Sequence, residues 1–238
     1  MFVPDPSRVP SPPPHPGATT PHQLVGERQV DGLARIFAKG LNDGTEAAQR
    51  FLAVARDQGY DVRAVYGTLE PVTNRVREAA LGIPGPGRTA MFYVSAPPSG
   101  GADSSTGLPE RASCIDSVCA HVGQLREGHH ARVCIAQTLL DPSEPAPARA
   151  FEGASFQRVG RLRYLHQPIG RPSRTALRWP LGVEVKSVGN LAVGSNSRRS
   201  LLLAMVRSYV GTLDCPSLCG LRATDDVLAS HLATGAWD

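Results

Sequence analysis

The stretch that decides the fold is RVCIAQTLLDPSEPAPARAFEGASFQRVGRLRYLHQ, residues 132–167. Its apolar run at 133–140 is bounded by a charged residue and by Asp-Pro, which is typical of a strand buried on both faces. Apolar residues at helical spacing over 146–156 predict a helix, and two prolines lie where its first turn begins. Approximate alternation over 159–165 then predicts a second strand. A strand, a helix and another strand indicate a mixed α/β or α+β sheet with a helix on one face.

The sequence before this stretch divides into further segments with helical or strand periodicity. Three segments carry apolar residues at helical spacing, which predicts helices at 29–41, 45–59 and 110–125. Three short apolar runs predict strands at 62–69, 76–81 and 90–96. Gly- and Pro-rich segments predict a rigid loop at 83–88 and a flexible loop at 97–107. The predicted order is two helices, three strands, a helix, a strand, a helix and a strand.

The first 24 residues differ in composition from the rest of the chain. They contain eight prolines and few large apolar side chains. Such a segment buries too little apolar surface to offset the entropy that it would lose on folding. We therefore expect residues 1–24 to form a disordered, Pro-rich tail.

Composition excludes two broad classes of function. The chain has 238 residues, of which 41% are hydrophobic, and a formal net charge of +4. Lys39 and Lys186 are its only lysines, and the arginines are dispersed rather than gathered in a basic run, which argues against a nucleic-acid partner. The longest aliphatic run near the C-terminus, 201–206, is far shorter than a membrane span, so we expect no membrane insertion.

The cysteines and histidines indicate neither a disulfide framework nor a metal site. Five cysteines form an odd set without regular spacing, and the chain lacks a secretory h-region, so we expect reduced thiols and a cytoplasmic location. Cys215 and Cys219 lack the second ligand pair of a zinc site, and His129-His130 has no third ligand nearby in sequence. We therefore predict no metal.

The predicted order of elements resembles that of the GNAT superfamily of acyl-CoA-dependent N-acetyltransferases. The resemblance covers roughly residues 25–167, and its best local support is residues 141–156, where Glu144, Ala148, Phe151 and Ser155-Phe156 occupy positions of the family's pattern. The resemblance implies an α/β (α+β) fold with a central mixed sheet and helices on both faces. It also implies the transfer of an acyl group from acetyl-CoA, as co-substrate, to an amine on a small molecule, a protein N-terminus or a protein side chain.

Residues that would bind the cofactor follow from the same resemblance. The family holds the pyrophosphate in a Gly-rich turn after the central strand, which is predicted here at 89–95. The matching positions are Ser95, at the end of that strand, and Ser99, Gly100, Gly101 and Gly107 in the loop after it. The loop lacks the Gln or Arg of the family signature.

Catalytic residues are less well specified. The family's tyrosine, which returns a proton to the CoA thiolate, aligns with Phe151, which carries no acidic proton. Tyr93 and Tyr164 are the alternative proton donors, and each can equally be a packing residue of a strand. Glu70 and Glu78 are candidate bases, or else solvated carboxylates.

The last 71 residues, 168–238, resemble the beginning of a second GNAT-like half. A strand is predicted at 181–188, and helices are predicted at 200–209 and 224–234. In such a partial half we expect apolar faces that pack on the first domain, on a second copy of the chain or on a partner chain. This suggests an alternative to the enzyme: a catalytically inactive GNAT-like module with a structural or protein-interaction role.

Overall fold

The structure is a computed structural model that describes residues 2–4, 19–38, 44–97, 107–125, 132–161, 182, 191–211 and 220–233. The chain divides into two compact units. The first unit comprises residues 1–160 together with 220–238, and the second comprises residues 161–219. The segment expected at 168–238 coincides with neither unit, since residues 220–238 fall in the first unit.

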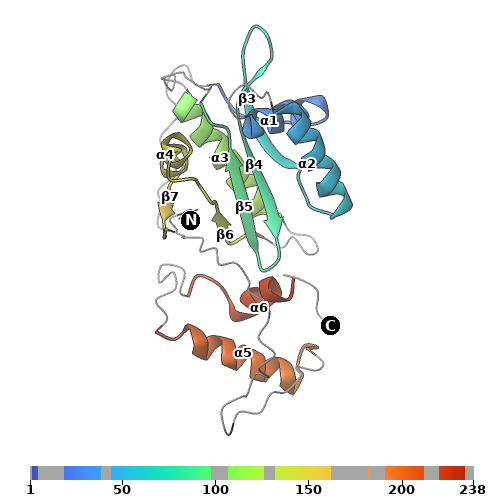
Figure 1. Ribbon diagram of the computed structural model, residues 1–238, viewed down its shortest axis with the longest axis vertical. Helices are drawn as coiled ribbons and strands as arrows, with labels where there is room; N and C mark the ends of the chain where they lie inside the picture. The colour runs from blue at the N-terminus through green and yellow to red at the C-terminus, as the bar shows by residue number, and fades with distance from the viewer. Residues whose placement is uncertain are drawn as a thin grey trace, which may run out of the picture. The chain divides into compact units, whose positions relative to one another are not determined.

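The first unit is built on a five-stranded mixed sheet (Figure 1). In spatial order its strands are β2 (His22–Gln23), β3 (Ala64–Leu69), β4 (Val76–Gly85), β5 (Thr89–Val94) and β6 (Ile135–Gln137). Neighbouring strands are antiparallel except for β5 and β6, which are parallel. A separate antiparallel pair joins β1 (Phe2–Pro4) to β7 (Phe156–Arg158).

Six helices lie in the described part of the chain. They are α1 (Glu27–Phe37), α2 (Thr45–Asp57), α3 (Gly107–Gln124), α4 (Pro145–Gly153), α5 (Asn196–Tyr209) and α6 (Thr224–Leu232). Two buried clusters show how the helices cover the sheet: α1 and α2 pack with Val65 and Leu81, and α3 and α4 pack with Ala80 and Phe92. Because adjacent strand residues point to opposite faces, the helices cover both faces. The predicted mixed sheet with helices on both faces is thus confirmed.

The β4 strand lies between the two helical layers and requires small residues on the α3 side. A Cβ atom at Gly82 would lie 2.5 Å from Cγ1 of Val118 in α3. The flanking Ala80 is fully buried among α3 side chains, whereas Leu81 contributes to the cluster on the other face. These small side chains let α3 approach the sheet closely.

The predicted rigid loop at 83–88 begins later than expected. Strand β4 continues to Gly85, with Pro84 opposite Ala90 of β5. On its other side, β3 pairs with β4 only as far as Gly82. Successive residues of a strand direct their backbone N–H groups to opposite neighbouring strands, and the nitrogen of Pro84 faces the side of β3. Because β3 has already ended there, the missing N–H of proline costs no hydrogen bond between strands.

The turn between α1 and α2 requires glycine. Gly44 adopts a left-handed conformation with φ of 79°, directly before Thr45, where α2 begins. A Cβ atom at this position would lie 2.1 Å from the carbonyl oxygen of Ala34 in α1. The helical hairpin predicted from the sequence therefore depends on close backbone contact at one residue.

Parts of the expected tail belong to the fold. Residues Phe2–Pro4 form β1 against β7, and His22–Gln23 form the edge strand β2. Leu24 is buried, and its N–H donates to the carbonyl of Val65 at 2.8 Å. These two segments therefore pair with distant strands, and local composition does not reveal such long-range pairing.

Two predicted elements of the opening stretch are present with shifted ends. The strand expected at 133–140 is β6, which is shorter, and the helix expected at 146–156 is α4, with Pro145 in its first turn. Strand β7 (Phe156–Arg158) ends before the strand expected at 159–165 would begin. Residues 159–161 form no strand, and residues 162–165 lie outside the described ranges.

The second unit contains α5, which matches the helix predicted at 200–209. Ser195 caps the helix, because its hydroxyl accepts a hydrogen bond from the Arg198 N–H at 3.2 Å. No residue of α5 is fully buried, and Leu203, Val206 and Tyr209 are exposed. The strand predicted at 181–188 lies outside the described residues apart from Gly182.

Candidate functional site

The most unusual feature of the sheet is the place where β5 and β6 separate. The two parallel strands are in register over three positions, the last of which pairs Met91 with Gln137. One step further, the Thr138 hydroxyl donates to the carbonyl of Phe92 at 2.9 Å. Strand β5 continues to Val94 without a further register partner among the described residues of β6.

The backbone of β5 beyond Phe92 faces this opening. The Ser95 N–H donates to the carbonyl of Ala79 in β4 at 2.9 Å. Since backbone groups alternate along a strand, Val94 directs its N–H and C=O away from β4 and toward the side of β6. This part of the β5 edge is therefore placed to pair with an extended, amide-bearing ligand.

Tyr93 lies beside the opening on the face of the sheet opposite α3. Its neighbours Phe92 and Val94 belong to the buried cluster under α3, whereas the Tyr93 side chain is 39% exposed. Partial burial raises the pKa of the Tyr93 phenol above its ordinary value of 10.0. The phenol therefore remains protonated at neutral pH and can donate a proton.

Ser95, a predicted cofactor-binding residue, uses its side chain inside the protein. It is fully buried, and its hydroxyl donates to Oε2 of Glu78 while accepting a hydrogen bond from the Ala79 N–H at 3.1 Å. The side chain thus fixes the end of β5 against β4. Contact between Ser95 and a ligand would require these bonds to break.

Glu78 is the centre of a buried ionic cluster at this end of the sheet. Its carboxylate contacts Nη2 of Arg35 in α1 at 3.1 Å and Nη1 of Arg111 in α3 at 2.9 Å. Burial raises the pKa of Glu78 above its ordinary value of 4.5, and Arg35, Ser95 and Arg111 partly oppose this effect. Glu78, a candidate base in the sequence, joins the two helical layers across the sheet.

A second carboxylate extends the cluster into the first turn of α3. Glu110 is fully buried, and it contacts Nη2 of Arg77 at 3.3 Å and accepts a hydrogen bond from the Thr68 hydroxyl at 2.9 Å. The Thr68 hydroxyl in turn accepts the Glu78 N–H at 3.3 Å. The sequence analysis did not identify Arg111 and Glu110 as members of a buried ionic cluster. The only sign of it in the sequence is that two adjacent charged residues stand at the start of a helix with an apolar face.

The remaining predicted cofactor residues are only partly described. Gly107 is the buried first residue of α3. Ser99, Gly100, Gly101 and the alternative proton donor Tyr164 lie outside the described residues. Of the predicted site residues, Tyr93 and Ser95 thus lie at the end of β5, and the predicted phosphate loop remains an expectation.

Glu70 lies away from the opening, in the turn between β3 and β4. Its carboxylate accepts a hydrogen bond from the Thr73 hydroxyl, and its N–H donates to the carbonyl of Arg75 at 2.9 Å. The side chain thus stabilises its own turn.

Phe151, which the resemblance noted in the sequence would align with a catalytic tyrosine, is a core residue. It is fully buried in α4, and its ring lies edge-on to Phe156 at 5.0 Å between centroids. Phe156 in turn contacts Phe92 of β5 at 5.7 Å. This aromatic cluster supports the strands on the α3 side, opposite Tyr93.

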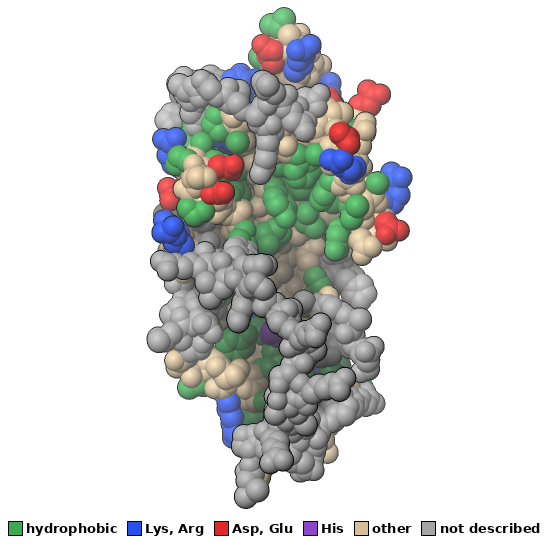
Figure 2. Space-filling model, viewed as in Figure 1, with side chains coloured by type: hydrophobic (Ala, Val, Ile, Leu, Met, Phe, Trp, Pro, Cys, Tyr) green, Lys and Arg blue, Asp and Glu red, His purple; other side chains and the backbone are tan. Residues whose placement is uncertain are grey.

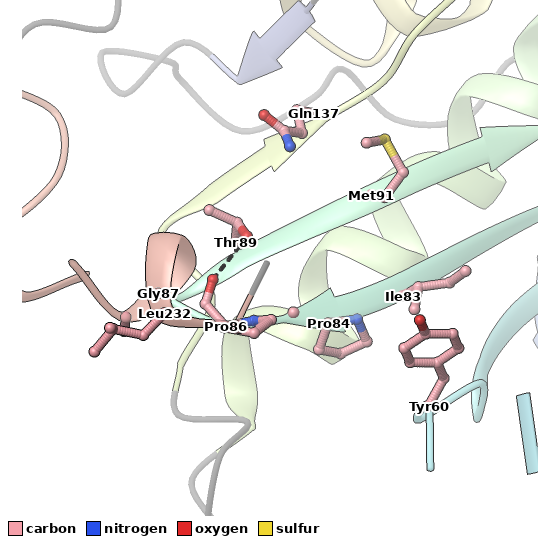
Figure 3. A pocket seen from close by; sticks show the side chains of 12 residues that line it. Tyr60, Ile83, Pro84, Pro86, Gly87, Thr89, Met91, Gln137 and Leu232 are labelled. Atoms are coloured by element: carbon pink, nitrogen blue, oxygen red, sulfur yellow. Dashed lines mark hydrogen bonds between the residues drawn. The ribbon is translucent and has the colours of Figure 1, made fainter. Parts of the chain in front are cut away.

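A pocket of about 710 Å³ adjoins the opening on the Tyr93 side of the sheet. Met91 and Gln137, the last pair in register, both line it, together with Ile83 of β4 and Tyr60 after α2 (Figure 3). Figure 2 shows hydrophobic side chains gathered over the middle of the sheet in the same region. The sequence contains no signal for this pocket, because residues from four separate stretches of the chain form it.

Two predicted absences can be examined within the described residues. No group of three or more His, Cys, Asp and Glu side chains is arranged there to hold a metal ion. No helix in the described ranges has the length and apolar character needed to cross a membrane. Comparison with known proteins gives no matching family model, curated protein or solved structure.

Proposed function

We propose that this chain is a GNAT-like N-acyltransferase, which transfers an acetyl group from acetyl-CoA to an amine. The observation that carries the proposal is the opening between β5 and β6 after the Met91–Gln137 pair. The pantetheine arm of acetyl-CoA is extended and carries amide groups, so it can pair with the edge of β5 at Val94, where β6 no longer pairs with it. The order of elements from β2 to β7 is the order that the family resemblance implies, and it supports the same proposal.

The reaction requires one nucleophilic attack and two proton transfers. The nitrogen of the neutral amine attacks the thioester carbonyl carbon, and the carbon–sulfur bond breaks to release the CoA thiolate. Tyr93 beside the opening gives its proton to the thiolate. The proton that leaves the amine nitrogen returns to Tyr93 through water, so the products are an amide and free CoA thiol.

Binding of acetyl-CoA is the first prediction of this proposal. A ligand present at about 100 times its Kd stabilises a protein by about 2.7 kcal/mol, which for a chain of this size raises the Tm by several degrees. We expect that rise with acetyl-CoA, together with binding heat in calorimetry. Acetyl phosphate, which has no pantetheine arm, serves as the control and should leave the Tm unchanged. Absence of both a shift and binding heat with acetyl-CoA would refute the proposal.

Replacing Tyr93 with phenylalanine is the second prediction. The ring and its packing are retained, whereas the proton donor is lost, so we expect kcat to fall about 100-fold with little change in acetyl-CoA binding. Release of CoA thiol, detected with a thiol reagent, gives the rate. Tyr209→Phe, which removes an exposed phenol of α5 outside the pocket, is the matched control. An unchanged kcat in Tyr93→Phe would exclude Tyr93 as the donor.

The alternative of an inactive module has support of its own. Phe151 is a core residue where the family has a tyrosine, and the Ser95 hydroxyl is committed to Glu78. The exposed apolar side chains of α5, Leu203 and Val206, would suit contact with a partner. This alternative predicts a protein that yields no CoA thiol with any amine, even where acetyl-CoA binds.

A further inference from the structure

The pocket beside β5 and β6 is closed at one end by the C-terminal helix α6. Ala229 and Leu232 of α6 line it opposite Ile83 and Met91 of the sheet. Gly87, at the turn that joins β4 to β5, lines the same pocket as Leu232 (Figure 3). The pocket thus combines strands from the middle of the chain with a helix more than 130 residues later.

Helix α6 is fixed to this turn by specific contacts. Nε of Arg88 lies 3.0 Å from Oδ2 of Asp226, and the Ser230 hydroxyl donates to the carbonyl of Pro86 at 3.0 Å. Arg222, just before the helix, donates to the carbonyl of Gly87 at 3.2 Å. These contacts on both sides of the turn hold the helix as a permanent wall of the pocket.

Gly87 allows the helix to come this close. Its φ is 70°, in the left-handed region, and a Cβ atom at this position would lie 2.0 Å from the carbonyl oxygen of Asp226. A side chain at this position would push α6 away from the turn. The position of α6 against the pocket therefore depends on glycine at residue 87 of the turn.

The chemistry of the lining defines what the pocket can hold. None of the described residues that line it carries a charged side chain. The Thr89 hydroxyl donates to the carbonyl of Pro86 at 3.1 Å, whereas the side chains of Gln137 and Tyr60 make no hydrogen bond with a described residue. The pocket thus offers an apolar surface with a free amide and a free phenol, and its volume is that of a typical small-molecule site.

We infer that this pocket binds the acyl acceptor, and that the acceptor is an amine carried on an uncharged apolar body, such as an alkyl or arylalkyl chain. The inference rests on the proposed function, because it names the substrate of the same site. The apolar body lies between Ile83, Met91 and Leu232, and the amine lies near Gln137, whose carbonyl oxygen accepts its N–H. Gln137 is in the last register pair before the strands separate, so the amine reaches the opening where the thioester would lie.

This lining argues against polycationic acceptors. A spermidine or aminoglycoside body would place ammonium groups against apolar side chains with no carboxylate to balance them. Glu78 does not supply one, because its carboxylate is buried among Arg35, Arg111 and Ser95. Selectivity for apolar amines therefore follows from the absence of charge among the described lining residues.

A homologous series of alkylamines tests the inference without acetyl-CoA. Each buried methylene strengthens binding about fourfold, so we expect octylamine, which has four more methylenes than butylamine, to bind roughly 250-fold more tightly in calorimetry with the full chain. Spermidine, titrated under the same conditions, should bind more weakly than butylamine. A flat chain-length series, or spermidine that binds as tightly as octylamine, would overturn the inference.

Two substitutions on α6 locate the binding site. Leu232→Arg brings a charged side chain into the pocket, and we expect it to weaken octylamine binding at least tenfold. Ala229→Arg is a second variant on the same wall with the same expectation. The matched control is His231→Arg, which adds the same side chain one residue away at an exposed position outside the lining. Circular dichroism melting checks that each variant folds, and folded variants that retain full octylamine affinity would overturn the assignment to this pocket.

The two proposals fail in different ways. Alkylamine binding that depends on chain length and on Leu232, in a protein that binds no acetyl-CoA, supports the pocket and refutes the acyltransferase. Acetyl-CoA binding with turnover of amines, but without dependence on chain length or on Leu232, supports the acyltransferase and refutes the inferred acceptor class.

Discussion

Replacing Glu78 with alanine is expected to lower the free energy of unfolding by about 3–5 kcal/mol at pH 7, the cost of breaking a buried ion pair by removal of one partner. The substitution deprives the fully buried Arg111 and the partly buried Arg35 of a shared carboxylate, and it removes the acceptor of the Ser95 hydroxyl. Urea unfolding followed by circular dichroism measures the loss.

Glu152→Ala is the control for this substitution. Glu152 is an exposed glutamate of α4, so its replacement should change the free energy of unfolding by less than about 0.5 kcal/mol. If Glu78→Ala costs no more than Glu152→Ala, then the cluster does not join the two helical layers as described.

The same carboxyl group predicts the direction of a pH effect. The pKa of Glu78 is raised above 4.5 in the folded protein, so the folded state keeps a proton that the unfolded state has already lost. Its contribution to stability is fully present below about pH 4.5 and is lost as the pH rises through the raised pKa. We therefore expect the stability of the wild type relative to Glu78→Gln to fall as the pH rises over this window. A relative stability that rises instead would mean that Arg35 and Arg111 outweigh burial.

Replacing Phe151 with alanine is expected to cost about 3–5 kcal/mol of unfolding free energy. Its ring is fully buried and contacts Phe156, so its removal leaves a cavity under the sheet. Val54→Ala in α2 is the control, because Val54 is exposed and should change stability by less than about 0.5 kcal/mol. Guanidinium unfolding of both variants tests the comparison.

Phe151→Tyr separates the structural role from the family's catalytic role. The added hydroxyl enters an apolar cluster, which costs about 1–3 kcal/mol when no hydrogen bond compensates. We expect lower stability and no gain in the release of CoA thiol. A gain in rate would show that the α4 position takes part in proton transfer and that Phe151 is more than a core residue.

Much of the local structure could be predicted, since its signals are local. The helix at 45–59 and the strand at 62–69 appear as α2 and β3 with small shifts, because apolar spacing and a glycine mark their ends. The fold resemblance also depended on element order, which the sequence carries directly. Local signals were insufficient where a distant partner decides the outcome: Pro84 is allowed in β4 because β3 has ended, and Phe2–Pro4 form a strand by pairing with β7.

The candidate site was less predictable than the fold. Tyr93 could be predicted as a candidate proton donor because the sequence places a tyrosine within a buried strand. The role of Ser95 was not visible, since its hydroxyl bonds to Glu78, a residue 17 positions away. Arg111 could not be assigned a role from its charge at the start of a helix, because a buried arginine cannot be distinguished from an exposed one without its partner.

The sequence by itself determined the kind and order of the elements, because helical and strand periodicity, prolines and glycines act within a few residues. Only the tertiary structure decided which side chains meet. Arg35 and Arg111, 43 and 33 residues from Glu78, converge on one carboxylate, and Ser230 closes on Pro86 across 144 residues. The opening beside Val94 and the pocket under α6 exist because packing brings segments that are distant in the sequence together. Local sequence patterns carry no information about such contacts.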